Sequence, residues 1–300
     1  MKESKPTIII MVGLSGSGKS SIAKELANEY NSKIVSSDDI RGEICEGGVP
    51  DQSKNGEVFK VFHNRIRETL KNRKNVIADA TNITIKSRRA ILENIKNIDC
   101  YKICYIVPKR YNDCLRDNKN REYPVPDKVI KKQMYRFQIP FFEEGFDEII
   151  IHKFFYIPDT YCFYKMFDFD QQNPHHKYSL YIHSEKVTEL FDDNDVDNKY
   201  EKYYVATYLH DIGKTLTQTF DDDGIAHYYG HAEVGSYHLL THCNYIDDES
   251  MLNYCFLINY HMMPFSWNNE KTHNKYKKIF GEYLYNMLIY FNECDSNEST

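Results

Sequence analysis

The sequence lacks the patterns that mark secretion and membrane insertion. No apolar run approaches the roughly 20 residues that a membrane-spanning helix needs. The apolar stretch Thr7–Val12 is too short for the core of a secretory signal. None of the eight cysteines belongs to a C-x-x-C pair, and without a secretory signal they indicate reduced thiols. We therefore expect a cytoplasmic protein with no membrane partner.

Arginine is absent from the second half of the chain. All ten arginines lie at or before Arg136, whereas ten of the twelve histidines lie at or after His175. The formal net charge of −6 disfavours a protein that coats nucleic acid. That total hides a split, since residues 1–150 carry 27 Lys+Arg and 21 Asp+Glu and residues 151–300 carry 11 and 23. Such asymmetry predicts two domains with different chemistry.

A glycine-rich motif follows the first apolar run. Thr7–Val12 reads as a strand, Gly13-Leu-Ser15-Gly16-Ser17-Gly18-Lys19-Ser20 comes next, and a helical pattern follows. This is G-x-x-x-x-G-K-S in the strand–loop–helix context of a P-loop, in which backbone N–H groups wrap a phosphate chain. Lys19 would reach the β- and γ-phosphates of ATP, and the Ser20 hydroxyl would ligate Mg²⁺. The members that we assign to nucleotide binding are Gly13, Ser15, Gly16, Ser17, Gly18, Lys19 and Ser20.

Further strands and helices alternate through the first half. Strands are predicted at Lys33–Ser36, Asn75–Ala78, Tyr101–Val107 and Glu148–Ile151, and helices at about 57–72, 86–96 and 126–137. Strands that alternate with helices predict a parallel sheet covered on both faces. Ligands of such sheets bind beyond the carboxyl ends of the strands.

Charged residues follow the predicted strand ends. Asp38 suits a general base that accepts the proton of an acceptor hydroxyl, although a carboxylate there also suits a helix N-cap, a role that Asp39 fits. The run from Arg116 to Arg121 follows the fourth strand. It fits either an arginine-bearing lid over ATP or a solvated charged helix, and both readings stay open.

Residues 7–151 resemble the P-loop kinase domain of polynucleotide 5′-kinases. The resemblance rests on Gly13–Ser20, Ser37-Asp-Asp-Ile-Arg41, Asp79-Ala-Thr81-Asn82, Arg88-Arg89, Arg121-x-x-Pro-Val-Pro and the stretch from Pro140 to Asp147. It implies that Asp38 is the general base, that Arg41 binds the phosphate beside the acceptor end, and that Arg116 or Arg121 is the lid arginine. Asp79, with Thr81 and Asn82, would help to place the acceptor.

The second half is predicted to be helical and holds most of the histidines. Residues 171–295 resemble the HD phosphohydrolase superfamily through His183, His210-Asp211-Ile-Gly-Lys214, Gly230-His231-Ala-Glu-Val-Gly235 and Tyr260-His261. By that resemblance a divalent metal such as Mn²⁺, Co²⁺, Ni²⁺, Fe²⁺ or Zn²⁺ would activate water. Lys214 would steady the phosphate, and His176 would contact the substrate. The implied metal ligands are His183, His210, Asp211, His231, His261 and Asp295.

The two resemblances together predict a bifunctional enzyme that heals nucleic-acid ends. The organisation is an α/β P-loop kinase domain at 1–152, a linker at 153–172 and an all-α HD-domain helical bundle at 173–300. The substrate would be an RNA terminus, or less favourably a DNA terminus, that gains a 5′-phosphate and loses a 2′,3′-cyclic, 2′- or 3′-phosphate. An RNA ligase and a second copy of the chain are the protein partners considered. The alternatives are a nucleoside kinase fused to a nucleotide hydrolase, and an ATP-gated phosphohydrolase without kinase activity.

Overall fold

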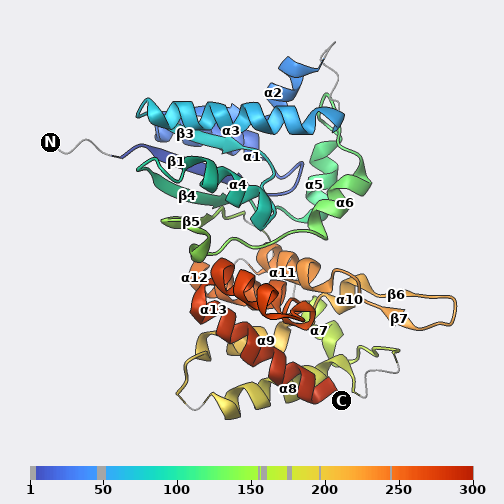
Figure 1. The fold of residues 1–300 in the computed structure, drawn as a ribbon. Helices are drawn as coiled ribbons and strands as arrows, with labels where there is room; N and C mark the ends of the chain where they lie inside the picture. The colour runs from blue at the N-terminus through green and yellow to red at the C-terminus, as the bar shows by residue number, and fades with distance from the viewer. Residues whose placement is uncertain are drawn as a thin grey trace. The chain divides into compact units, whose positions relative to one another are not determined.

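The chain forms two compact units (Figure 1). The computed structural model describes residues 5–45, 52–154, 156, 161–173, 178–195, 197–243 and 245–299. The first unit, here the N-terminal unit, is Met1–Gln133 together with Glu144–Phe154. The second, here the C-terminal unit, is Met134–Glu143 together with Phe155–Thr300.

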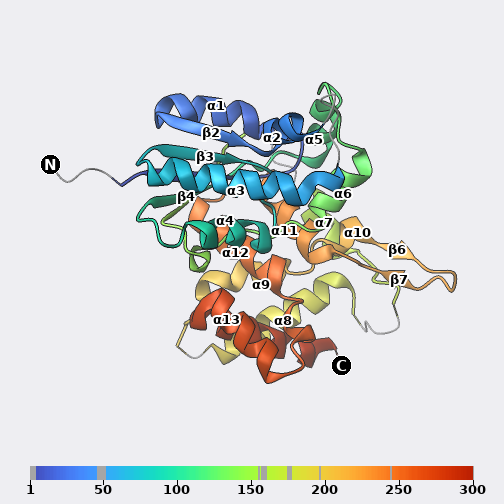
Figure 2. The same ribbon diagram turned by 45° about the horizontal axis from the view of Figure 1, so that its top comes forward.

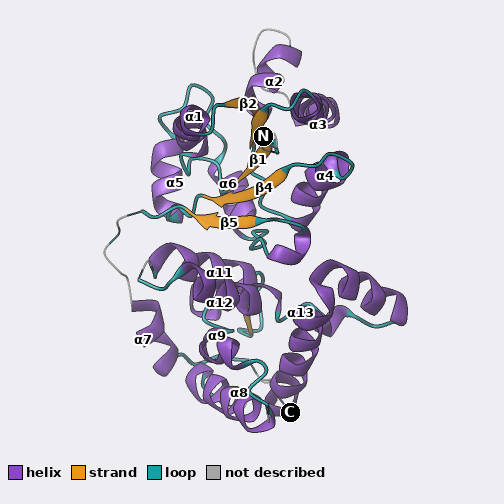
Figure 3. Cartoon of the chain, turned by 90° about the vertical axis from the view of Figure 1, so that its left-hand side faces the viewer, coloured by secondary structure: helices purple, strands orange, loops and turns teal. Residues whose placement is uncertain are grey.

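The N-terminal unit is built on a five-stranded sheet with the order β2-β3-β1-β4-β5, in which every pairing is parallel. The strands predicted from the sequence are confirmed. Figure 3 shows helices on both faces of this sheet, as the alternation of strands and helices requires. The strands are β1 (Thr7–Val12), β2 (Ser32–Ser36), β3 (Asn75–Asp79), β4 (Tyr101–Ile106) and β5 (Glu148–Ile151).

The core of this unit is formed between β1 and the helix that follows it. Ile9 and Met11 of β1 cluster with Ile22 and Leu26 of α1. Residues two apart share one face of a strand and residues four apart share one face of a helix, so both pairs point into the same core. The helices are α1 (Lys19–Glu29), α2 (Ser37–Ile44), α3 (Asn55–Lys71), α4 (Ile85–Ile95), α5 (Tyr111–Asn118) and α6 (Asp127–Met134), with short 3-10 turns at Gln52–Lys54 and Phe142–Glu144.

The N-cap of α2 differs from the expectation. The side chain of Ser36 accepts the hydrogen bond from the Asp39 backbone N–H, so Ser36 is the cap and Asp39 lies in the first helical turn. A hydroxyl on the last strand residue caps the helix because β2 runs into α2 without a loop. The prediction of Asp39 as cap was wrong, and both aspartates instead lie where the positive end of the helix dipole favours them.

A buried ion pair joins distant parts of the N-terminal unit. Arg88 of α4 and Glu144 have fully buried side chains, with Nη2 of Arg88 2.6 Å from Oε1 of Glu144. The Arg88 Nε also donates to Glu144, and Nη1 donates to the Asn82 carbonyl at 3.2 Å. This pair fixes the segment that leads into β5 against α4.

The C-terminal unit is mostly helical. The prediction of an all-α bundle is wrong in one detail, because Thr219–Phe220 (β6) and Ala226–His227 (β7) form a small antiparallel hairpin. Figures 1 and 2 show this hairpin extending from the helices of its own unit. Within the described residues, no helix is long and apolar enough to cross a membrane. The helices are α7 (Tyr161–Phe167), α8 (Leu180–Asn194), α9 (Tyr204–Leu209), α10 (Lys214–Thr217), α11 (His231–His242), α12 (Asp248–Tyr260) and α13 (Glu270–Ser299), with 3-10 turns at Glu201–Tyr203 and Pro264–Ser266.

Two stretches depart from the simple division of the sequence at residue 152. Helix α7 lies inside the segment 153–172 that was interpreted as a linker. The stretch Met134–Glu143 packs within the C-terminal unit. There Asn259 donates to the Phe137 carbonyl at 3.0 Å and accepts from the Ile139 N–H at 2.7 Å. The ring of Phe141 packs between the rings of Phe256 and Phe280. Aromatic core contacts therefore decide where this stretch belongs.

Candidate functional site

The first candidate site is the loop between β1 and α1. Gly16 and Gly18 have φ values of +82° and +93°, which L side chains rarely adopt. A Cβ at Gly16 would lie 2.2 Å from the Cys114 carbonyl oxygen. Helix α1 begins at Lys19, so the backbone N–H groups of Lys19 and Ser20 have no acceptor within the helix, whereas those of Ser21 and Ile22 donate to the Gly18 carbonyl. Together with the helix dipole, these donors make an anion site.

Side chains around this loop fit a phosphate chain. The Lys19 ammonium donates to the Leu14 carbonyl at 2.8 Å, and burial lowers the pKa of Lys19 while nearby Asp79 opposes that shift. The Ser17 hydroxyl is buried and has no partner among the described residues. Gln133 holds the loop, since its amide accepts from the Ser15 N–H and donates to the Ser15 hydroxyl. A buried cation and an unsatisfied hydroxyl beside free N–H groups suit the phosphates of ATP.

Asp79 lies beside the P-loop at the end of β3. Burial raises the pKa of Asp79, whereas Lys19 and a hydrogen bond with Ser20 lower it. A carboxylate in contact with the predicted Mg²⁺ ligand Ser20 suits an ion bound on the nucleotide side. The resemblance implied an acceptor-placing role for Asp79, and in the structure this side chain lies beside Lys19 and Ser20 of the P-loop.

An arginine–aspartate pair lies at the same edge of the sheet. Nη2 of Arg121 donates to Oδ2 of Asp38 at 2.6 Å. The Arg116 side chain is 67% exposed and pairs with Asp113 and Asp117 of its own helix, α5. Of the two candidate lid arginines, the structure therefore brings only Arg121 to the predicted base.

The remaining predicted residues of this unit make hydrogen bonds within the fold. Arg41 is buried, and its guanidinium donates to Asn55 at 2.7 Å. The Asn82 amide donates to the Met11 carbonyl at 2.9 Å, and the Thr81 carbonyl accepts from the Gly13 N–H at 3.0 Å. Asn82 also has a φ of +44°, a left-handed conformation that asparagine tolerates. These contacts clamp β1 to the loop after β3, so Thr81 and Asn82 act on the position of the P-loop.

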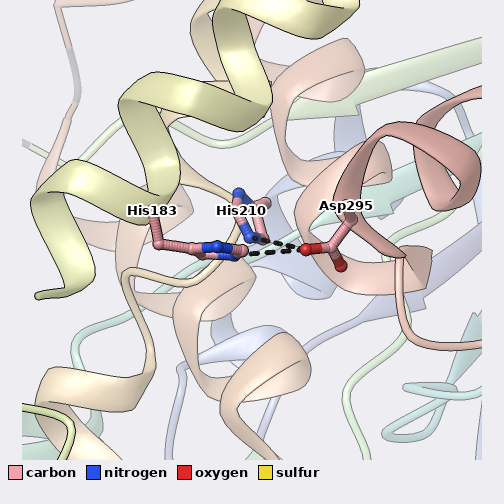
Figure 4. A group of neighbouring side chains, drawn as sticks. All are labelled: His183, His210 and Asp295. Atoms are coloured by element: carbon pink, nitrogen blue, oxygen red, sulfur yellow. Dashed lines mark ion pairs between the residues drawn. The ribbon is translucent and has the colours of Figure 1, made fainter. Parts of the chain in front are cut away.

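The second candidate site brings six side chains of the C-terminal unit together. Nε2 of His183 lies 3.2 Å from Oδ1 of Asp295, and Nε2 of His210 lies 3.8 Å from the same oxygen (Figure 4). These three residues form one group that could hold a metal ion, and Asp211, His231 and His261 form another. The six residues come from different helices. His183 lies in α8 and Asp295 in α13, and the other four lie at the ends or starts of the helices between them. Helical bundles build metal sites from several helices in this way.

The orientation of the imidazoles fits metal ligation. The Nδ1 atoms of His210, His231 and His261 each lie 2.6–2.9 Å from a backbone carbonyl three residues earlier. A carbonyl accepts a hydrogen bond, so Nδ1 carries the proton and Nε2 keeps its lone pair. Those Nε2 atoms lie 3.1–3.6 Å from Asp211 carboxylate oxygens. The Nε2 atom of His210 is buried and has no hydrogen-bond partner among the described residues. A bound metal ion would take up its lone pair.

Asp211 lies between the two groups. Burial alone would raise the pKa of Asp211, but Lys214 and His210 hold it well below its usual range. Nζ of Lys214 is 2.7 Å from Oδ2 of Asp211. Asp295 is 5% exposed although it lies close to the end of α13, so fraying does not remove it from the cluster. An ionised carboxylate flanked by imidazoles can bridge two cations.

Two glycines allow the cluster to form. A Cβ on Gly213 would lie 2.0 Å from the His231 carbonyl oxygen and 2.8 Å from the Gly235 backbone nitrogen. The backbones of the turn before α10 and of α11 therefore touch, which brings Asp211 and His231 to one place. The glycines in both sequence motifs have a packing role.

The other histidines lie apart from the cluster. His238 and His242 stack on each other along α11, and His273 bonds the Tyr285 hydroxyl at 2.7 Å. His227 lies on the hairpin and pairs with Asp221. His175 and the predicted substrate contact His176 lie outside the described residues.

Comparison with known proteins bears on the N-terminal half. Residues 8–140 match the family model described as an AAA domain. This region matches an AAA-type P-loop domain. L-seryl-tRNA(Sec) kinase of Methanococcus maripaludis is 27% identical over 135 residues, which are 44% of this chain and 53% of that protein. The match thus spans about half the length of this curated relative.

Solved structures also resemble part of the chain. A chain of the Pnkp1/Rnl/Hen1 RNA repair complex has a TM-score of 0.40 at 23% identity, with 44% of each chain covered. A sugar kinase from Janibacter sp. HTCC2649 has a TM-score of 0.38 at 14% identity, with 49% of this chain and 84% of that chain covered.

Proposed function

We propose that this chain is a bifunctional enzyme that heals the ends of nucleic acid, RNA in preference to DNA. Its P-loop unit would transfer the γ-phosphoryl group of ATP to a 5′-hydroxyl. Its helical unit, as an HD-type phosphohydrolase, would remove a 2′,3′-cyclic, 2′- or 3′-phosphate with divalent metals. The observation that carries the proposal is the convergence of six buried His and Asp side chains, Asp211 among them, in a chain that also holds a P-loop. One end of a broken strand needs a phosphate added and the other needs one removed, so both chemistries suit one substrate.

The kinase step follows from the residues around the P-loop. Lys19 and the N-terminus of α1 would hold the β- and γ-phosphates, and Ser20 with Asp79 would hold Mg²⁺, which neutralises charge on the phosphates. Asp38 accepts the proton of the 5′-hydroxyl as its oxygen bonds to the γ-phosphorus and the bond to ADP breaks. Arg121, whose Nη2 lies 2.6 Å from Oδ2 of Asp38, would contact the γ-phosphate and so leave the carboxylate free to accept the proton. The relative named L-seryl-tRNA(Sec) kinase supports an acceptor hydroxyl carried on RNA.

Arg121→Ala against Arg116→Ala tests this assignment. An arginine that neutralises the transferring group contributes about 10³-fold or more to kcat. We expect a loss of that order in Arg121→Ala and less than about threefold in Arg116→Ala, since Arg116 pairs only within its own region. The assay follows labelled ATP with a 5′-hydroxyl oligonucleotide beside a panel of nucleosides. Equal losses in the two variants would contradict the role of Arg121, and labelling of nucleosides alone would favour a metabolic kinase.

The phosphohydrolase step would use both metal groups. His183, His210 and Asp295 would hold one ion and Asp211, His231 and His261 a second. Bound divalent ions supply a water that ionises near neutral pH and a Lewis acid for the phosphoryl oxygens. Lys214, whose ammonium is within 3 Å of both Asp211 and Gln171, would contact the phosphate charge. The water oxygen bonds to phosphorus, the ester P–O bond breaks, and the departing ribose oxygen takes up a proton.

Removal of one metal ligand tests the second activity. Asp211→Ala should abolish release of phosphate from a 3′-phosphorylated oligonucleotide in the presence of Mn²⁺, Co²⁺, Ni²⁺, Fe²⁺ or Zn²⁺. The same variant should label 5′-hydroxyl ends at the wild-type rate, whereas Lys19→Ala should do the reverse. Phosphate release by Asp211→Ala at the wild-type rate would eliminate the proposed centre. A phosphatase rate that rises with ATP, with no acceptor labelled, would show an ATP-gated hydrolase instead.

A further inference from the structure

The C-terminal unit contains a cavity that joins the metal-binding cluster to an aromatic surface. Its volume is about 540 Å³, and its lining includes Asp211 and Lys214 as well as Tyr229, Met262 and Phe265. The last three are 74%, 42% and 46% exposed, which is unusual for large apolar side chains grouped in one place. The cavity thus offers charge for a phosphate and apolar area for the group that carries it.

Tyr229 is an exposed aromatic residue that stacks on a neighbouring imidazole. Its ring stacks on His227 with an interplanar angle of 7° and a centroid separation of 5.5 Å. Nε2 of His227 lies 2.9 Å from a carboxylate oxygen of Asp221 in the same hairpin, which fixes the imidazole. Across the part of the chain that the structure describes, His227 is the single ring in contact with Tyr229. One face of the tyrosine is therefore supported, most of the residue is exposed, and it forms part of the cavity lining.

We infer that Tyr229, backed by His227, is the stacking platform for the base of the terminal nucleotide whose phosphate lies at Asp211 and Lys214. The inference rests on the proposed function and adds the recognition of the leaving nucleoside. A supported aromatic ring with its second face open matches a purine or pyrimidine, because every base has a flat face and stacks in a sequence-tolerant way. An acyl chain provides no such face. Tyr229 is a substrate-binding residue in this scheme, and His227 is a positioning residue.

The test uses the whole 300-residue chain and compares a substrate that has a terminal base with one that lacks it. Two 3′-phosphorylated oligonucleotides are used, one ending in adenosine and one ending in an abasic ribose. The variants are Tyr229→Ala, Tyr229→Phe and the control Phe220→Ala. Phe220 is a matched control because it is 52% exposed on the same hairpin and does not line the cavity.

We expect the wild-type protein to favour the adenosine-ended substrate in kcat/KM by about tenfold, in line with the stacking free energy of one base. Tyr229→Ala should abolish this preference through KM with kcat kept, while Tyr229→Phe and Phe220→Ala should retain it. A fall in Tyr229→Ala that is equal for the two substrates, or no change, would overturn the inference.

Binding of the same two oligonucleotides, measured by fluorescence anisotropy without turnover, separates this inference from the proposed reaction. If no phosphate is released under any metal, the hydrolase proposal fails. The stacking inference then stands only if wild-type protein binds the adenosine end about tenfold more tightly and Tyr229→Ala does not. Equal binding of both ends by the wild-type protein would overturn it.

Discussion

Arg88→Ala is expected to destabilise the N-terminal unit far more than the same change at the neighbouring Arg89. The Arg88 and Glu144 side chains are both completely buried, and three hydrogen bonds join the guanidinium to the carboxylate. Removal of one partner leaves an uncompensated charge inside the protein, which costs about 3–5 kcal/mol. Loss of the bond to the Asn82 carbonyl also loosens the loop that clamps β1. Arg89 is exposed, so its replacement should change stability by less than about 0.5 kcal/mol.

The assay is thermal unfolding of the full chain followed by circular dichroism. ATP with Mg²⁺ should raise only the transition of the N-terminal unit, which identifies it. Arg88→Ala should lower that transition by about 10 °C, since 1 kcal/mol corresponds to about 3 °C in a unit of this size. Arg88→Lys should also be destabilised, because an ammonium cannot make the bidentate contact. Equal transition temperatures for Arg88→Ala and Arg89→Ala would refute the reasoning.

Two further outcomes follow from packing and from protonation. Gly213→Ala should lower the unfolding free energy of the C-terminal unit by at least about 1 kcal/mol, because the added Cβ would lie 2.0 Å from a backbone oxygen. The same variant should retain less metal in equilibrium dialysis. Gly56→Ala, with open space around it, is the control. Wild-type metal retention in Gly213→Ala would count against the helix approach. Burial lowers the pKa of His63 and of His152, so the unfolded chain binds these protons more readily and stability falls as pH drops through the ordinary histidine range. The urea midpoint of the N-terminal unit should therefore fall from pH 7.5 to 5.5, and His63→Gln with His152→Gln should reduce that fall; an unchanged slope would contradict it.

Local patterns predicted much of the N-terminal unit. The P-loop and the strands around it follow from short-range rules, namely glycines at positive φ, a helix start that binds anions and apolar β-branched runs. The N-cap of α2 was misplaced because Ser36, Ser37, Asp38 and Asp39 are all residue types that cap helices, and the sequence alone does not show which side chain meets the first free N–H. Which of Arg116 and Arg121 lies near the predicted base depends on tertiary structure, because both precede the same Pro-Val-Pro segment in sequence. In the structure Arg116 pairs with acids of its own helix and Arg121 pairs with Asp38.

Long-range packing explains what the sequence did not predict. Met134–Glu143 continues the kinase-like pattern in sequence, yet Phe137 and Phe141 pack on residues at least 100 positions later. The proximity of Asp295 to the histidines is likewise a tertiary fact, which sequence reasoning reached through family resemblance. Tyr229 had no signal of its own, because an exposed aromatic beside a motif histidine is informative only once its stacking partner is known.

The central claim is that two separate units act on the two ends of one broken strand. The most direct measurement is incubation of the full chain with ATP, Mg²⁺, Mn²⁺ and an RNA that bears a 5′-hydroxyl and a 2′,3′-cyclic phosphate, followed by mass analysis of both termini. We expect a 5′-phosphate and a 3′-end without phosphate from the wild-type protein. Lys19→Ala should change only the 3′-end and Asp211→Ala only the 5′-end. Unchanged termini with the wild-type protein, or loss of both reactions in either well-folded variant, would contradict the account.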